Sequence, residues 1–295
     1  MTEKHPFTLV GIRPEVTSSP QKPRRLRGFP WVSGALLGAL ALLCLFAEVL
    51  MTHDPGYLDL QNCNAAPGPE FLFGTDALGR DIFSGIWYGG RISISIGLLA
   101  TVVSTGIAVV YGTVSGLASQ WLDALLMRFA ELFLSVPGVL LVLFLQAILG
   151  AGNVLSLSLV IGVTGWAPIA KVVRTEVRQL RRCEYVAACR CMGGGFRHIL
   201  VKHLAPNFIA SIMFMVTMNV RSAIGLEATL SFLGMGLPLE TVSWGSMLSL
   251  AEKALLTDSW WIIVIPGAFL VTLMLCLTNL GNYLRKAANR KGSNL

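Results

Sequence analysis

The segment Glu184–Asn207, EYVAACRCMGGGFRHILVKHLAPN, interrupts a chain that is otherwise strongly apolar. Its first half carries apolar side chains at i, i+3, i+4 and i+7, and its second half repeats this spacing, which is typical of two short amphipathic helices. Three consecutive glycines starting at Gly193 separate the halves and permit a turn with positive φ. Pro206 suits the first turn of a following helix. The sequence therefore predicts a helical hairpin over 184–204.

The rest of the chain has the composition of a membrane protein. Of its 295 residues, 54% are hydrophobic and 13% are charged, whereas a soluble domain has about 25% charged residues. Because one transmembrane helix needs about 20 mostly apolar residues, we expect an all-α membrane protein with six transmembrane helices. Their approximate ranges are 31–51, 90–118, 126–149, 154–172, 206–232 and 260–284. The first range is longer than a typical signal-peptide core, so we interpret it as a retained span.

The distribution of charge predicts the orientation. Basic residues gather in the N-terminal tail, in the segment 171–202 and at the C-terminus, and with six spans these regions share one side of the membrane. The positive-inside rule makes that side cytoplasmic, so both termini are expected there. The net charge of +7 does not indicate nucleic-acid binding, because the basic segments lack interleaved aromatic residues. The expected organisation is a cytoplasmic tail at 1–30, a first helix at 31–51, an extracytoplasmic loop at 52–89, a core of five helices at 90–284 and a cytoplasmic tail at 285–295.

The second half of the extracytoplasmic loop is expected to form a short interfacial helix. Ile82, Ile86 and Trp87 share one helical face, and a tryptophan suits the level of the lipid headgroups. Asp76 and Asp81 are both candidate helix caps. Two roles stay open for this motif, bracing the core of the protein or contacting an external protein.

Charged residues within the expected spans are candidate functional residues. Arg221 and Glu227 lie in the fifth range, and charges inside a span either pair or line a pathway. Six residues place them about 120° apart around a helix, so we expect that they do not pair with each other. Pathway lining and pairing with another span both stay open. Arg128 and Glu131 are one turn apart and are expected to form a local ion pair.

Close helix packing is indicated by Gly112-x-x-x-Gly116 in the second range, either within the chain or between two chains. No Walker A pattern and no His-Glu-x-x-His pattern occurs, so the sequence predicts no catalytic residue. The pair Cys189-x-Cys191 lacks further ligands at zinc spacing. His53 and Cys63 share the outer loop without a fixed ligand spacing, so no metal site is predicted.

Six stretches together resemble the permeases of ABC importers, in particular the C-type subunit of the dipeptide/oligopeptide/nickel family. Glu184, Ala188, Gly193 and Pro206 stand at the spacing of that family's EAA-type loop. The other matches are FGTDALGRDIFSG (73–85), MRFAELFLSVP (127–137), LEATLSFLGMGLPLETVSWGSML (226–248), and WWIIVIPG with NLGNYLRKA near the C-terminus. The resemblance covers about residues 31–290 and implies a type I ABC importer permease fold with a cytoplasmic coupling hairpin.

The resemblance also implies partners and a mechanism. The chain would sit in a bacterial cytoplasmic (inner) membrane beside a second homologous permease, surrounded by lipid. Two cytoplasmic ATPase subunits would bind ATP and Mg, so this chain would need no cofactor of its own, and an extracytoplasmic solute-binding protein would deliver the cargo. Peptides are the expected cargo, with nickel, metal–opine chelates and glutathione as alternatives. An intramembrane enzyme and a scaffold that recruits a cytosolic partner are the competing classes. Co-purification of an ATPase, together with ATP turnover that the substrate stimulates, separates a permease from both.

Two groups of residues carry the functional expectations of this resemblance. The extracytoplasmic motif comprises Gly74, Thr75, Asp76, Gly79, Arg80 and Asp81. ATPase coupling is expected from the hairpin, through Glu184, Tyr185, Ala188, Arg190, Gly193, Phe196, Arg197, Leu200 and Pro206.

Overall fold

The computed structural model describes residues 30–149, 152–181, 205–238, 240–250, 254 and 257–291. Within these ranges every regular element is a helix, apart from one isolated bridge between Thr75 and Asp81, which confirms the all-α prediction. The predicted hairpin 184–204 lies outside the described residues, and so do its site residues from Glu184 to Leu200. Pro206 is the second residue of a long helix, which agrees with the prediction of a helix start.

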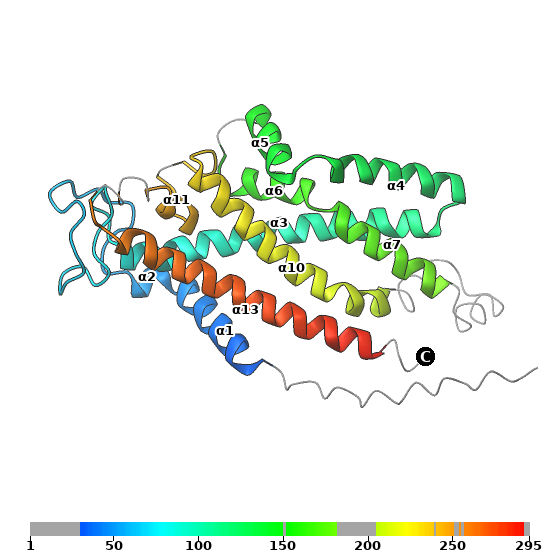
Figure 1. The fold of residues 1–295 in the computed structure, drawn as a ribbon, viewed down its shortest axis with the longest axis horizontal. Helices are drawn as coiled ribbons and strands as arrows, with labels where there is room; N and C mark the ends of the chain where they lie inside the picture. Colours follow the sequence, from blue (N-terminus) through cyan, green and yellow to red (C-terminus); the bar gives the residue numbers. More distant parts are fainter. Residues whose placement is uncertain are drawn as a thin grey trace, which may run out of the picture.

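The long helices run roughly along the longest axis of the molecule, whereas α5 stands across it (Figure 1). One end, here called the loop end, carries residues 52–81 and α11. The other, here called the Arg181 end, carries the C-terminus of α7 and the N-terminus of α10. In chain order the helices are α1 (Trp31–Leu45), α2 (Ala47–Leu50), α3 (Ile82–Leu117), α4 (Gln120–Ser135), α5 (Gly138–Leu149), α6 (Val154–Thr164), α7 (Ala167–Arg181), α10 (Ala205–Phe232), α11 (Trp244–Leu248) and α13 (Trp261–Lys291).

Two of the expected spans are broken helices. The axes of α4 and α5 differ by 89°, and those of α6 and α7 by 48°. Val136 precedes Pro137 and has an extended backbone, because proline disfavours the helical conformation of the residue before it. Pro168 lies in the first turn of α7, where its fixed φ is tolerated. By length and composition, the described residues contain two helices that can cross a membrane, α3 and α13, or up to four spans if each bent pair counts as one.

The predicted boundary between an interfacial helix and the second span is wrong. The helix α3 begins at Ile82 and continues for 36 residues without a break at 90. Trp87 does not face lipid headgroups, because it is only 8% exposed. Its indole makes edge-on contacts with Phe83 and with Phe269 of α13, at centroid distances of 5.9 and 5.5 Å. Packing against α13 therefore extends α3 beyond the length that the local sequence suggested.

Close packing of α3 against α7 fixes the Arg181 end. A Cβ added to Gly112 would lie 2.5 Å from the carbonyl oxygen of Ala170, and one added to Gly116 would lie 2.9 Å from Cγ1 of Val177. Only glycine permits this approach without a shift of one helix. The Gly112-x-x-x-Gly116 pattern thus serves packing within the chain.

Candidate functional site

The extracytoplasmic motif folds as one unit at the loop end. Asp81 is the N-cap of α3, and its carboxylate accepts hydrogen bonds from the backbone N–H groups of Phe83 and Ser84, at 3.3 and 3.0 Å. The hydroxyl of Thr52 also donates to Asp81, at 3.0 Å. Of the two candidate caps, Asp81 is therefore the residue that starts the helix, and it also connects α3 to the segment that follows α2.

Asp76 organises the turn before this cap. Its Oδ1 accepts hydrogen bonds from the backbone N–H groups of Leu78 and Arg80, at 2.7 and 2.9 Å. Burial raises the pKa of Asp76 above its ordinary value, while these two N–H groups oppose the rise because they stabilise the carboxylate. Gly79 adopts φ +75°, and a Cβ there would overlap the backbone of Asp59, so glycine is required.

The same motif is attached to the last long helix. The indole Nε1 of Trp261 in α13 donates to the carbonyl oxygen of Thr75 at 3.1 Å. A Cβ on Gly74 would lie 2.8 Å from that indole nitrogen, so the backbone and the ring are in tight contact. The motif therefore joins the start of α3 to the start of α13, which is the geometry that a bracing role requires.

Glu227 is buried in the interior of the chain and does not face an open channel. It is 0% exposed, and all of its partners are hydroxyl groups. Its Oε1 accepts from Ser231 at 3.0 Å and from Ser243 at 2.8 Å, and its Oε2 accepts from Ser93 at 3.0 Å. The carboxylate therefore connects α10 to α3 and to the start of α11. Of the two roles left open by the sequence, this geometry is that of structural pairing.

The helix that this network holds, α11, is not among the helices expected from the sequence. The five-residue α11 begins at the N-cap Ser243, whose side chain forms a capping box with Ser246. Its first residue, Trp244, is completely buried, and its Nε1 donates to the carbonyl oxygen of Ile86 at 2.8 Å. A Cβ on Gly90 would lie 2.6 Å from the same indole. The sequence signal for this helix is the spacing of Ser243 and Ser246, which is that of a capping box.

Arg221 has different surroundings from Glu227. Its Nε is buried without a hydrogen-bond partner, and the residues that the structure describes provide no carboxylate paired with it. The expectation that Arg221 and Glu227 do not pair with each other is confirmed within these residues. An arginine in this position meets the general condition for a functional charge in a span.

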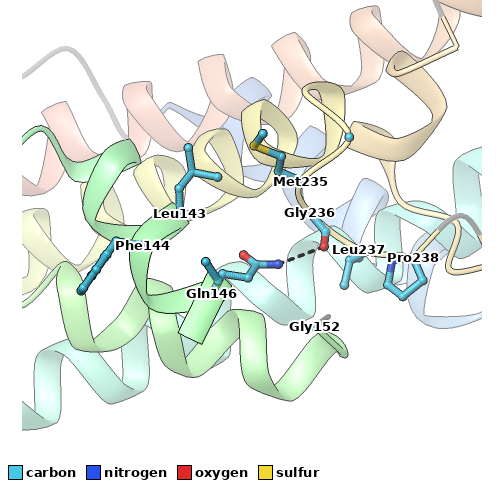
Figure 2. A pocket seen from close by; sticks show the side chains of 10 residues that line it. Leu143, Phe144, Gln146, Gly152, Met235, Gly236, Leu237 and Pro238 are labelled. Carbon is cyan, nitrogen blue, oxygen red and sulfur yellow. Dashed lines mark hydrogen bonds between the residues drawn. The ribbon is translucent and has the colours of Figure 1, made fainter. Parts of the chain in front are cut away.

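A cavity of about 720 Å³ opens near the loop end between α5 and the segment 234–238 (Figure 2). Leu143 and Phe144 of α5 and Leu237 form apolar walls, and the lining contains no charged side chain. The side chain of Gln146 extends across to the opposite segment, where its Nε2 donates to the carbonyl oxygen of Gly236 at 3.1 Å (Figure 2). Arg221 and Glu227, the candidate pathway residues, are not part of this lining.

At the Arg181 end, an ionic cluster fixes the helix that leads into 182–204. Asp123 of α4 contacts Arg174 of α7 through both carboxylate oxygens, and Nη2 of Arg178 lies 2.9 Å from its Oδ2. The hydroxyl of Ser115 in α3 donates to the same carboxylate at 2.6 Å. Asp123 thus joins α3, α4 and α7. These contacts fix α7, the helix that directly precedes the predicted hairpin.

A second ionic group lies further along α4. Arg128 and Glu131 form the predicted local pair at 3.2 Å, and Lys171 of α7 lies 3.6 Å from the same glutamate.

On the loop side, His53 and Cys63 are not brought into a metal site. Among the described residues, no three His, Cys, Asp or Glu side chains cluster closely enough to hold a metal ion.

The described residues thus form long and broken apolar helices of the kind that can cross a membrane. A family model described as the inner membrane component of binding-protein-dependent transport systems matches residues 108–290, and the chain belongs to this family. The resemblance inferred from the motifs is thereby confirmed, and the chain is a multi-pass transport subunit and not an enzyme.

Relatives cover most of the chain. A putative peptide permease protein of Brucella suis biovar 1 is 37% identical over 259 residues, which are 86% of this chain and 85% of the relative. The oligopeptide transport system permease protein OppC of Bacillus subtilis is 37% identical over 85% of this chain and 82% of its own length. The dipeptide transport system permease protein DppC of the same organism is 34% identical over 87% of this chain and 82% of its own length.

Proposed function

We propose that this chain is the permease subunit of an ATP-driven importer of di- and oligopeptides and forms half of the translocation pathway. The observation that carries the proposal is that relatives named as peptide permeases align with at least 85% of the chain. The importer contains a second homologous permease, two cytoplasmic ATPase subunits and an extracytoplasmic solute-binding protein. ATP and Mg bind to the ATPase subunits, and this chain carries no cofactor.

The proposed topology has six spans with both termini in the cytoplasm. Support comes from the Arg181 end, where α7 carries Lys171, Arg174, Arg178 and Arg181. The positive-inside rule assigns such an end to the cytoplasm and the loop end to the opposite side. In this orientation the segment 184–204 faces the ATPase subunits, and the extracytoplasmic motif faces the binding protein.

Coupling follows from how the two helices that flank 182–204 are anchored. On one side, α7 is packed against α3 through Gly112 and Gly116 and is fixed by Asp123. On the other side, α10 has 28 residues and spans roughly 40 Å to the loop end. There, Glu227 holds α11. A displacement of the hairpin by the ATPases therefore moves α10 and its attached loop as a rigid lever, which changes the access to the pathway.

The cavity between α5 and 234–238 supports peptides as the cargo. Its apolar walls accept varied side chains, and the amide of Gln146 is a neutral polar group suited to a peptide backbone. A metal ion would require several nitrogen, oxygen or sulfur ligands, and the described residues offer no such cluster. Glutathione is itself a tripeptide and falls within the same class of cargo.

The experiment that tests this function is purification of the tagged chain from its host in detergent, followed by identification of bound subunits and measurement of ATP turnover. We expect a homologous permease and ATPase subunits to co-purify, and turnover to rise when a peptide-loaded binding protein is added. ATP turnover that is stimulated by nickel and not by any peptide would contradict the proposal that peptides are the cargo. Recovery of the chain without an ATPase, under conditions that keep other importers intact, would contradict the proposal that it belongs to an ATP-driven importer.

A further inference from the structure

A second polar cavity, of about 480 Å³, lies at the Arg181 end, where α3 turns into α4 beside α7. Gly116, Ala118 and Gln120 form one side, and Arg178 and Arg181 form the other. A smaller cavity of about 200 Å³ shares Arg178 and is lined by its neighbours on α7. The transport mechanism proposed above gives neither cavity a role.

The arginines at this cavity carry more positive charge than their partners neutralise. Arg178 contacts Asp123, but Asp123 is also the partner of Arg174. Arg181 donates from Nη1 to the backbone carbonyl oxygen of Leu117 at 3.2 Å, which is a neutral acceptor. The guanidinium groups of Arg174, Arg178 and Arg181 therefore lie at these two cavities, and the single carboxylate of Asp123 pairs with the first two. A compact anion with several acceptor oxygens is the ligand that such a group of arginines binds best.

Neighbouring acids do not remove this excess. Glu131, the next carboxylate along α4, is occupied by Arg128 and Lys171. The three arginines carry three positive charges, and Asp123 and Glu176 of α7 together carry two negative charges. One positive charge therefore remains. The cavity is therefore electropositive and open to an anion.

The surface beside the cavity is apolar, which identifies where the anion comes from. Trp121, the residue after Gln120, is 75% exposed, and Leu125 one turn later is 53% exposed. On α3, Val114 lies one turn before Ala118 and is 51% exposed. An apolar groove of about 480 Å³ between α3 and α4 is lined by Gly106, Ile107, Val110, Tyr111, Val114 and Leu126. An exposed tryptophan at the end of an apolar helix marks the lipid headgroup level.

We propose that this cavity binds the phosphate of an anionic phospholipid. Arg178 and Arg181 contact the phosphate oxygens, Gln120 donates a hydrogen bond, and the acyl chains lie along the apolar faces of α3 and α4. Basic pockets between transmembrane helices bind anionic headgroups through the same combination of charge and apolar surroundings. The bound lipid cross-links the α3–α4 turn to the last turn of α7, directly before the segment 182–204.

The test uses the full-length chain purified in detergent and titrated with phosphatidylglycerol, phosphatidylcholine or inorganic phosphate, with native mass spectrometry as the readout. The variant Arg181→Gln keeps a donor for the carbonyl of Leu117 and removes the charge. Lys286→Gln is the matched control, because Lys286 is an exposed cation of α13 that does not line the cavity. We expect phosphatidylglycerol to bind the native chain in preference to phosphatidylcholine, about fivefold more weakly after Arg181→Gln and unchanged after Lys286→Gln.

A second variant guards against misfolding. Gln120→Leu leaves all the arginines in place, and we expect it to weaken phosphatidylglycerol binding about threefold. Unchanged lipid affinity in both variants would overturn the proposal. If inorganic phosphate bound as tightly as phosphatidylglycerol, the cavity would be a site for free phosphate and not for a lipid. If Arg181→Gln reduced the co-purified ATPase without changing lipid binding, the cavity would instead be a contact for an acidic group of the ATPase.

Discussion

Replacement of Glu227 by leucine tests the role of the buried carboxylate. Leucine has a similar size but no acceptor, so the hydroxyl donors of Ser93, Ser231 and Ser243 all lose their acceptor. Each buried donor without an acceptor costs about 1–3 kcal/mol. Since hydroxyls can rotate toward other acceptors, we take the lower value for each, which gives a loss of about 3 kcal/mol in the free energy of unfolding.

Glutamine at the same position is the matched control. Its carbonyl oxygen can replace Oε1 and accept from Ser231 and Ser243, while its amide donates to Ser93. Ser93 now accepts instead of donating, so we expect a loss of about 1 kcal/mol at most. The two variants therefore separate the loss of hydrogen-bond acceptors from the loss of negative charge.

The assay is thermal unfolding of the purified variants in one detergent, together with peptide uptake. Each kcal/mol lost lowers the midpoint of thermal unfolding by about 2–4 °C in a large domain. Glu227→Leu should therefore lower this midpoint by at least about 6 °C, and Glu227→Gln by less than about 4 °C. Equal and large losses in both variants would show that the charge itself is stabilising. A stable Glu227→Leu protein that no longer transports would return Glu227 to the translocation pathway and refute the structural role.

Three further predictions follow from the packing, the ionic cluster and the topology. Gly112→Ala should destabilise the protein by about 1–3 kcal/mol, because the new Cβ overlaps the carbonyl of Ala170, whereas Gly106→Ala meets no atom within 4 Å and should be stabilising by about 0.5–1 kcal/mol; equal melting midpoints would contradict the close approach of α3 and α7. Asp123→Asn should cost about 2 kcal/mol, between the values for exposed and buried ion pairs, and an unchanged midpoint in denaturation would show that the cluster is not stabilising. A membrane-impermeant maleimide should label Cys63 in intact cells, and labelling only after permeabilisation would reverse the orientation.

The local sequence predicted the kinds of element better than their ends. Apolar length located α3, α10 and α13, and the prolines at 137 and 168 marked the two bends, although the expected spans were drawn straight through them. The sequence predicted a break before residue 90, where α3 has none, because a tryptophan such as Trp87 is typical of a membrane interface. Only the distant Phe269, brought close by folding, shows why this tryptophan is interior.

The functional residues divide in the same way. The cap at Asp81 and the turn glycines have local signals, so their roles were accessible from the sequence. The partners of Glu227 are spread from Ser93 to Ser243, and no spacing rule connects residues so far apart in the chain. Gln146 was overlooked because a single amide in an apolar helix acquires meaning only when the facing segment is known.

The most direct test of the central claim is peptide uptake per ATP hydrolysed by the importer reconstituted in proteoliposomes, with the native chain compared with Gly193→Val. Gly193 belongs to the glycine turn of the predicted coupling hairpin, where a β-branched residue resists positive φ. We expect the variant to insert normally but to lose ATPase docking, or to hydrolyse ATP without matching uptake. Normal assembly with the native ratio of peptide transported to ATP consumed would contradict the hairpin as the element that couples hydrolysis to transport.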